Sequence, residues 1–262
     1  MRTELPSGTA AELVHPPTGP SSMGLVVIPD VMGMRPLFDD LVARLATGQN
    51  WSVAAFELYP GREGLDVAER LAAASSLQDD RVLGDAVAAA DLTGGDTVGV
   101  LGFCMGGMYV LKAVATGRFD SHCPFYGMIR VPEQWRGAGQ GEPLDAMAAG
   151  DAASVLAVIG TDDAWTPPKH VEELEATGAT VLRYVGADHG FVHDASRPAH
   201  RADDAADAWR RVVDWLGACA GAPTPVASAC PDGQLFAVCD AERRLRSAQR
   251  ARMVSCSRFV MR

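Results

Sequence analysis

The sequence predicts a doubly wound α/β fold, in which a mostly parallel sheet is flanked by helices. Short apolar runs bounded by turn residues recur along the chain, as they do in buried parallel strands. Segments whose apolar residues have helical spacing lie between these runs. Because strand and helix alternate through most of the 262 residues, we expect one large domain rather than two.

The predicted strands are apolar runs of six to nine residues, too short for buried helices of typical length. They are GLVVIPDV (residues 24–31), WSVAAFELY (51–59), TVGVLGFC (97–104), SVLAVIGT (154–161) and TVLRYV (180–185). The predicted helices are PLFDDLVARLAT (36–47), DDRVLGDAVAAADL (79–92), MGGMYVLKAVAT (105–116), HVEELEAT (170–177) and ADDAADAWRRVVDWL (202–216). The last of these places Trp209, Val212, Val213 and Leu216 on one face.

Composition excludes several function classes. The net charge of −10 argues against a nucleic-acid binder, which needs a basic face to neutralise phosphates. No apolar stretch reaches the roughly 18 residues of a membrane span, and the N-terminus lacks the apolar core of a signal peptide. We therefore expect a cytoplasmic protein that acts on a small molecule, as a monomer or small homo-oligomer.

The last 46 residues differ from the rest of the chain. They contain seven arginines and three acidic residues, and four of the six cysteines, whose uneven spacing fits no zinc template. No C-x-x-C pair occurs anywhere, so free thiols in a reducing compartment are expected. We predict a catalytic domain over residues 1–216 and a poorly ordered linker with a basic tail over residues 217–262.

The sharpest motif is G-x-C-x-G, which centres on Cys104 between a predicted strand and a predicted helix. A nucleophile on such a turn has a strained backbone, and the flanking glycines let neighbouring segments approach. The helix N-terminus also favours thiolate over thiol. The alternative is a buried core cysteine beside a strand-to-helix turn.

A cysteine nucleophile requires a histidine base and an acid that orients it. Asp162 and Asp163 follow the strand at residues 154–161, and His189 follows the strand at 180–185. Because the carboxyl ends of parallel strands share one edge of a sheet, these groups are expected to converge with Cys104. Taken singly, a pair of aspartates in a loop is more often a turn or helix cap, and a lone histidine is more often structural.

These motifs together resemble the dienelactone hydrolase family of α/β-hydrolase-fold enzymes, over roughly residues 20–216. The matching segments, in order, are VVIPDVMG, ELYPGR, GFCMGG, GTDDAWTP, and ADHGF followed by SRPAHRADDAADAWRRVVDWL. The family pattern G-x-x-D-x-x-x-P selects Asp163 rather than Asp162 as the acid, beside Cys104 as nucleophile and His189 as base. The resemblance implies an enzyme that needs no cofactor and no metal.

The resemblance also implies an oxyanion hole made by the backbone N–H groups of Val31 and Met105. Family members carry a glutamate that can pair with the resting cysteine just before the first of these, where this chain has Asp30, one methylene shorter. The alternative for Asp30 is a turn or capping role before the helix at residue 36.

Family members that act on dienelactone bind its carboxylate with arginines, one of them shortly after the histidine. Val192 and His193 occupy that stretch here, and Arg197 lies further on. The candidate substrate-binding residues are therefore Tyr59 and Arg62 in ELYPGR, with Arg35 and Arg81 as further cations. A metal site at His189 and His193 is rejected, because no third ligand lies near them in the sequence.

The expected function is hydrolysis of a small ester or lactone through a Cys-His-Asp triad and an acyl-enzyme. Two alternatives remain open. One is a general carboxylesterase or thioesterase with the same fold. The other is a non-catalytic protein of this fold that senses redox state through its thiol or binds a ligand.

Overall fold

The computed structural model describes residues 1–219. The chain divides into a unit of Met1–Ala222 and a unit of Pro223–Arg262, and the second unit lies outside the described residues. The predicted tail from residue 217 onward therefore also lies outside them, apart from its first three residues. Within residues 1–219, no helix is both long and apolar enough to cross a membrane.

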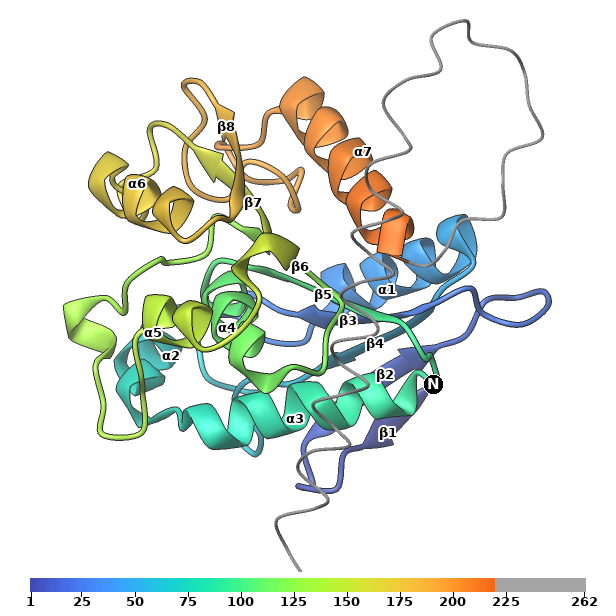
Figure 1. The fold of residues 1–262 in the computed structure, drawn as a ribbon. Helices are drawn as coiled ribbons and strands as arrows, with labels where there is room; N and C mark the ends of the chain where they lie inside the picture. The colour runs from blue at the N-terminus through green and yellow to red at the C-terminus, as the bar shows by residue number, and fades with distance from the viewer. Residues whose placement is uncertain (220–262) are drawn as a thin grey trace, which may run out of the picture. The chain divides into compact units, whose positions relative to one another are not determined.

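An eight-stranded sheet forms the centre of the described unit, with the strand order β1-β2-β4-β3-β5-β6-β7-β8 (Figure 1). The strands are β1 (Arg2–Glu4), β2 (Ala10–Val14), β3 (Gly24–Ile28), β4 (Ser52–Phe56), β5 (Val98–Phe103), β6 (Ser121–Phe125), β7 (Leu156–Gly160) and β8 (Thr180–Tyr184). Strands β4 to β8 run parallel, while β1 and β2 add an antiparallel edge. The predicted doubly wound, mostly parallel sheet is confirmed.

The strands that sequence analysis missed are those whose burial depends on distant neighbours. In β2 only alternate residues are buried, because one face of this edge segment is partly exposed. In β6 the polar residues Ser121 and His122 interrupt the apolar run, although both are buried in the sheet. The ring of His122 contacts the hydroxyl of Ser154 at 2.8 Å, which accounts for one of its polar atoms.

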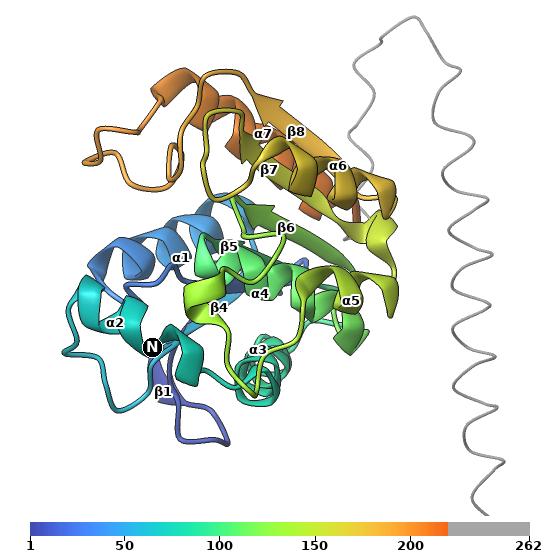
Figure 2. The same ribbon diagram turned by 90° about the vertical axis from the view of Figure 1, so that its left-hand side faces the viewer.

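Helices cover both faces of the sheet (Figures 1 and 2). One face carries α1 (Pro36–Gln49) and α7 (Ala202–Cys219), and the other carries α3 (Asp79–Leu92), α4 (Met105–Ala113) and α6 (Pro168–Ala176). The right-handed crossover rule explains this distribution, because the chain moves from β3 to β4 in one direction and from β4 to β8 in the other. Two short helices, α2 (Val67–Ala73) and α5 (Pro143–Ala148), and the 3₁₀ turns η1 (Ala74–Ser76), η2 (Val114–Thr116), η3 (Glu133–Trp135) and η4 (Ala152–Ser154) were not predicted as separate elements.

The central strands position the site. Every residue of β3, β4 and β5 is buried, so the backbone at their carboxyl ends is held by packing on both faces. Strand β3 ends three residues before its predicted end. Pro29 has no N–H to donate to the neighbouring strand, and Asp30 begins a turn in which its own carbonyl accepts a hydrogen bond from Gly33 N at 2.9 Å. The residues after β3, β5, β7 and β8 meet at one edge of the sheet.

Candidate active site

Cys104 stands on a strained turn between β5 and α4. Its φ of 56° and ψ of −117° place it in a region that residues with a side chain rarely adopt. The turn is tightly packed: a Cβ on Gly106 would lie 2.2 Å from the carbonyl oxygens of both Ile28 and Pro29. The glycine thus lets helix α4 approach the end of β3, and it holds the strained Cys104 at the sheet edge.

His189 and Asp163 form a hydrogen-bonded pair beside this turn. Nδ1 of His189 lies 2.8 Å from Oδ2 of Asp163, whose side chain is completely buried. The other carboxylate oxygen accepts from the backbone N–H of Trp165 at 2.8 Å, which orients the acid. An ionised carboxylate only accepts, so Nδ1 carries the proton and leaves Nε2 as the acceptor in the neutral ring.

Nε2 is the ring nitrogen of His189 that Asp163 leaves unbonded. Nε2 is buried and makes no well-aligned hydrogen bond within residues 1–219, while Cys104 is close enough to affect its protonation. Burial alone would lower the pKa of His189, but Asp163 and Cys104 outweigh it and raise that pKa to about 10. This environment favours the protonated, cationic form of the imidazole.

The two backbone amides expected to form an oxyanion hole are unengaged. Neither Val31 N nor Met105 N donates a hydrogen bond to any group of residues 1–219. Val31 lines the same cavity as Cys104, and Met105 is the first residue of α4, whose N–H has no partner within the helix. Two free donors beside a nucleophile can stabilise an oxyanion.

Asp30 is engaged by other groups than the thiol. Arg35 binds its carboxylate at two points, 2.7 and 2.8 Å, and Met32 N donates to it at 2.9 Å. Nε2 of His193 lies 2.9 Å from Oδ2. Burial would raise the pKa of Asp30, but His193 and Arg35 hold it well below the usual range. The carboxylate thus has the turn-forming role that was the alternative reading of the sequence, and it anchors the loop that carries Val31.

A cavity of about 400 Å³ opens onto Cys104 and His189. Its walls are largely apolar, and its charged members are Asp30, Arg35, Asp194 and Arg197. The apolar wall comprises Val31, Met32, Val67, Leu71, Met128, Trp135 and Trp165. The rings of Trp135 and Trp165 stack with centroids 5.4 Å apart. This cavity can take up a small, mostly apolar molecule next to the thiol.

Three predicted substrate-binding residues lie outside this wall. Tyr59 is fully buried, and its hydroxyl donates to the carbonyl of Arg70 at 3.0 Å and contacts the sulfur of Met105. Arg62 is exposed, with its guanidinium 3.4 to 3.5 Å from Ser76 Oγ. Arg81 pairs with Asp85 at 2.8 Å and donates to a backbone carbonyl. Tyr59 thus contacts the side chain of Met105, and Arg81 links α3 to the backbone just after β4.

A buried ion pair that sequence analysis did not identify supports the loop that carries Val31. Arg70 lies 3.0 Å from Glu57, and both side chains are at most 4% exposed. Glu57 also accepts from the backbone N–H groups of Met34 and Tyr59, both at 2.8 Å. A Cβ on Gly33 would lie 2.3 Å from the Glu57 carboxylate, so the loop turns directly over this pair. Glu57 could have indicated this ion pair, because it lies within the apolar run at residues 51–59 and a glutamate is rarely buried without a partner.

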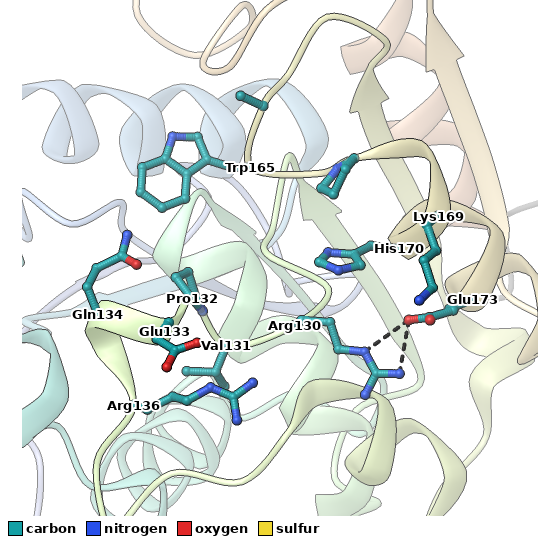
Figure 3. Close-up of a pocket in the computed structure, with 12 residues that line it drawn as sticks. Arg130, Val131, Pro132, Glu133, Gln134, Arg136, Trp165, Lys169, His170 and Glu173 are labelled. Carbon is teal, nitrogen blue, oxygen red and sulfur yellow. Dashed lines mark hydrogen bonds and ion pairs between the residues drawn. The ribbon is translucent and has the colours of Figure 1, made fainter.

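A second hollow of about 550 Å³ adjoins the cavity on the far side of Trp165 (Figure 3). It lies between the segment around η3 and the beginning of α6, and Figure 3 shows Arg130 paired with Glu173 along its wall at 2.9 to 3.0 Å. Its remaining charged side chains are of both signs, Glu133, Arg136 and Lys169. Trp165 thus lines both this hollow and the cavity at Cys104.

Comparisons with known proteins show which family the chain resembles. The family model described as "Dienelactone hydrolase family" matches residues 10–220. A "Carboxymethylenebutenolidase" from Rhodococcus opacus is 29% identical over 215 residues, which are 73% of this chain and 79% of the relative. A "Probable 2-oxo-3-(5-oxofuran-2-ylidene)propanoate lactonase" from Bradyrhizobium sp is also 29% identical, over 73% of this chain and 82% of the relative.

A solved structure shows the same fold. The "Putative Dienelactone Hydrolase" from Klebsiella pneumoniae subsp. pneumoniae superposes with a TM-score of 0.70 at 25% identity, covering 83% of this chain and 97% of that one. Since the family model spans most of the chain and the sheet, helices and site occur in the same unit, the assignment is independent of any single motif. The chain therefore belongs to the dienelactone hydrolase family and is an ester or lactone hydrolase with the α/β-hydrolase fold.

Proposed function

We propose that this protein hydrolyses a small carboxylic ester or lactone by nucleophilic catalysis, with Cys104 as nucleophile, His189 as base and Asp163 as orienting acid. One observation carries the proposal: the strained Cys104 faces a cavity that His189 also lines, and the buried carboxylate of Asp163 holds this imidazole by its far nitrogen. A merely structural cysteine needs neither the strained turn nor an oriented base.

The first half of the reaction transfers the acyl group to sulfur. The Cys104 thiolate attacks the carbonyl carbon, a C–S bond forms, and the carbonyl electron pair moves onto oxygen. The N–H groups of Val31 and Met105 stabilise this oxyanion. As the C–O bond breaks, the imidazolium of His189 gives its Nε2 proton to the leaving oxygen, which yields an alcohol or, from a lactone, a hydroxyl on the same molecule.

The second half returns the enzyme to its starting state. Nε2 of His189 takes a proton from water as the water oxygen attacks the thioester carbonyl. The C–S bond then breaks, the carboxylic acid leaves, and the thiolate remains beside the imidazolium. Asp163 keeps Nδ1 protonated throughout and stabilises the imidazolium in both halves.

The substrate class that the cavity favours is a small lactone with a carboxylate. The names of two relatives, a carboxymethylenebutenolidase and a propanoate lactonase, both describe enzymes that open a lactone carrying a carboxylate. Arg197 lines the cavity, is exposed, and forms no ion pair with residues 1–219. Its guanidinium is thus available to a carboxylate, whereas that of Arg35 is occupied by Asp30.

The test is steady-state hydrolysis of a short aryl ester and of a dienelactone by the parent and by Cys104→Ala and His189→Ala. Each variant is expected to lose about 10⁴-fold or more in kcat on the better substrate. Cys123→Ala, which removes another buried cysteine, is the matched control and retains the parent rate. An inactive parent, or a Cys104→Ala protein with parental kcat, would favour the thiol-sensing or ligand-binding alternative.

A further inference from the structure

Tyr126 lies at the junction of the segments that carry the proposed triad. It follows β6 with a left-handed φ of 40°, and its N–H donates to the carbonyl of Val158 in β7 at 2.7 Å. The carbonyl of the preceding residue, Phe125, accepts from Cys104 N at 3.0 Å. Its backbone therefore connects the cysteine turn to the strand that leads to Asp163. A tyrosine at positive φ is strained, which indicates that its side chain has a specific place to occupy.

That side chain touches two histidines. Its ring meets the ring of His189 edge to face, with centroids 5.1 Å apart. Its hydroxyl forms a short hydrogen bond with Nδ1 of His193, which lies four residues after His189 in the same loop. His193 is in turn bonded through Nε2 to Asp30. One continuous chain of contacts thus runs between two loops. The first carries His189 and His193, and the second, here called the oxyanion loop, carries Asp30 and Val31.

The protonation of this chain follows from its acceptors. Asp30 is ionised and only accepts, so Nε2 of His193 carries a hydrogen and donates it. Burial lowers the pKa of His193 despite the neighbouring carboxylate, so the ring is neutral and Nδ1 is left as an acceptor. Tyr126 then donates its hydroxyl hydrogen to that nitrogen. Every polar atom of the two rings is satisfied in a single arrangement.

The surroundings of His193 exclude a direct chemical role. Its side chain is 1% exposed, and the ring stacks on Phe103 at 4.6 Å and 22° and against Phe38 at 5.9 Å. Phe103 immediately precedes Cys104 in β5. His193 is absent from the cavity wall, so it touches neither substrate nor solvent, and it acts only through its neighbours.

We propose that Tyr126 and His193 are positioning residues of the hydrolase site: they hold the base His189 and the oxyanion loop, through Asp30, at a fixed separation on either side of Cys104. The inference rests on the proposed function of these groups. It explains why a polar chain is buried behind an otherwise aromatic wall, since loops that follow different strands need a specific link to keep catalytic geometry.

The test compares Tyr126→Phe, His193→Phe and His193→Gln with the parent in the full-length protein. Phenylalanine keeps the ring packing and removes the hydrogen bonds. Glutamine restores one donor and one acceptor at a spacing close to that of the imidazole nitrogens. Tyr184→Phe is the matched control, because it also removes one hydroxyl hydrogen bond, to the half-exposed Asp207 at 2.9 Å, outside the site.

Two quantities are measured on protein whose active-site concentration is determined by titration. The first is kcat and KM on the better ester or lactone, and the second is the rate of iodoacetamide alkylation at Cys104, followed by peptide mass spectrometry. We expect both phenylalanine variants to lose about 10- to 100-fold in kcat with KM changed less than about threefold, as for other supporting residues. Alkylation slows in both, and His193→Gln recovers most of each loss.

The proposal is overturned if kcat per active site and the alkylation rate of Tyr126→Phe and His193→Phe equal those of Tyr184→Phe, with only thermal stability reduced. Alkylation requires no substrate, so the outcome does not depend on the hydrolase assay. If the parent hydrolyses neither substrate while alkylation still slows in the two variants, the proposed function fails and the positioning role stands.

Discussion

Arg35 and Asp30 form a two-point ion pair at the first turn of the oxyanion loop, with nitrogen–oxygen distances of 2.7 and 2.8 Å. The carboxylate also accepts from Met32 N and from His193. With four donors around it, the carboxylate of Asp30 holds this loop in place. This arrangement has a measurable consequence for stability at low pH.

Asp30→Asn is expected to reduce the pH dependence of stability in acid. Burial would raise the folded-state pKa of Asp30, but the bonds from His193 and Arg35 outweigh it and lower that pKa below its usual value of 3.8. A lowered pKa stabilises the fold fully above the unfolded value and loses that contribution as the pH falls below it. The difference in unfolding free energy between parent and variant should be constant from about pH 5 to 8 and shrink below about pH 4. Urea titrations across this range measure it, with Asp39→Asn as an exposed control. A difference that does not change with pH would contradict the assignment.

Asp163→Asn is expected to lower kcat by about 10⁴-fold, because an amide that donates to Nδ1 reverses the imidazole tautomer. The neighbouring Asp162 provides the control. It is exposed and accepts from the hydroxyl of Thr161 at 3.1 Å, so Asp162→Asn should stay within about twofold of the parent. Steady-state kinetics on one substrate decide between the two aspartates. Equal losses in both variants would show that the loop, rather than the Asp163 carboxylate, matters.

Arg70→Met is expected to destabilise the fold by about 3–5 kcal/mol, because it leaves the buried charge of Glu57 without its partner. Arg44→Met is matched in chemistry, but Arg44 and Asp40 are each more than 60% exposed, so it should cost less than about 1 kcal/mol. Chemical denaturation of the two variants gives the comparison directly. Since Glu57 also holds the N–H of Met34, the first variant should lose kcat at temperatures where it is still folded. If the two variants lose equal stability, the Glu57 pair is not the support described above.

Arg197→Met is expected to raise KM for a carboxylate-bearing lactone by about tenfold or more, and to leave KM for a neutral aryl ester within about twofold, as loss of one charge-assisted contact predicts. Arg62→Met removes an exposed arginine outside the cavity and should change neither constant. The ratio of kcat/KM on the two substrates is the informative quantity. An unchanged ratio in Arg197→Met would remove the carboxylate from the proposed substrate, without affecting the proposed nucleophile.

Local pattern was sufficient for much of the fold. The predicted helix at residues 79–92 coincides with α3, and the apolar runs contain β3, β4, β5, β7 and β8. The first four of these strands are buried along their whole length and are therefore mostly apolar, whereas β8 is a partly exposed strand at the sheet edge. Strands β2 and β6 escaped prediction since their burial is set by neighbours that the local sequence does not contain. The helix predicted to end at residue 116 ends at Ala113 and continues as a 3₁₀ turn, a change that occurs within the last turn of many helices.

The site divides in the same way. Cys104 and His189 could be selected from sequence because each lies shortly after a predicted strand, and parallel topology brings strand ends to one edge. The choice of Asp163 over Asp162 depended on the resemblance to the family. The roles of Asp30 and Tyr59 could not be predicted, because each has a partner that is remote in the chain: His193 is 163 residues from Asp30, and Met105 is 46 residues from Tyr59. The sequence by itself determined the elements and the order of the chemical groups, since short-range periodicity and turn residues encode both. Only the tertiary structure decided which charges neutralise one another and which remain available to a substrate, because ion pairs and cavities form between segments whose distance in space no local pattern records.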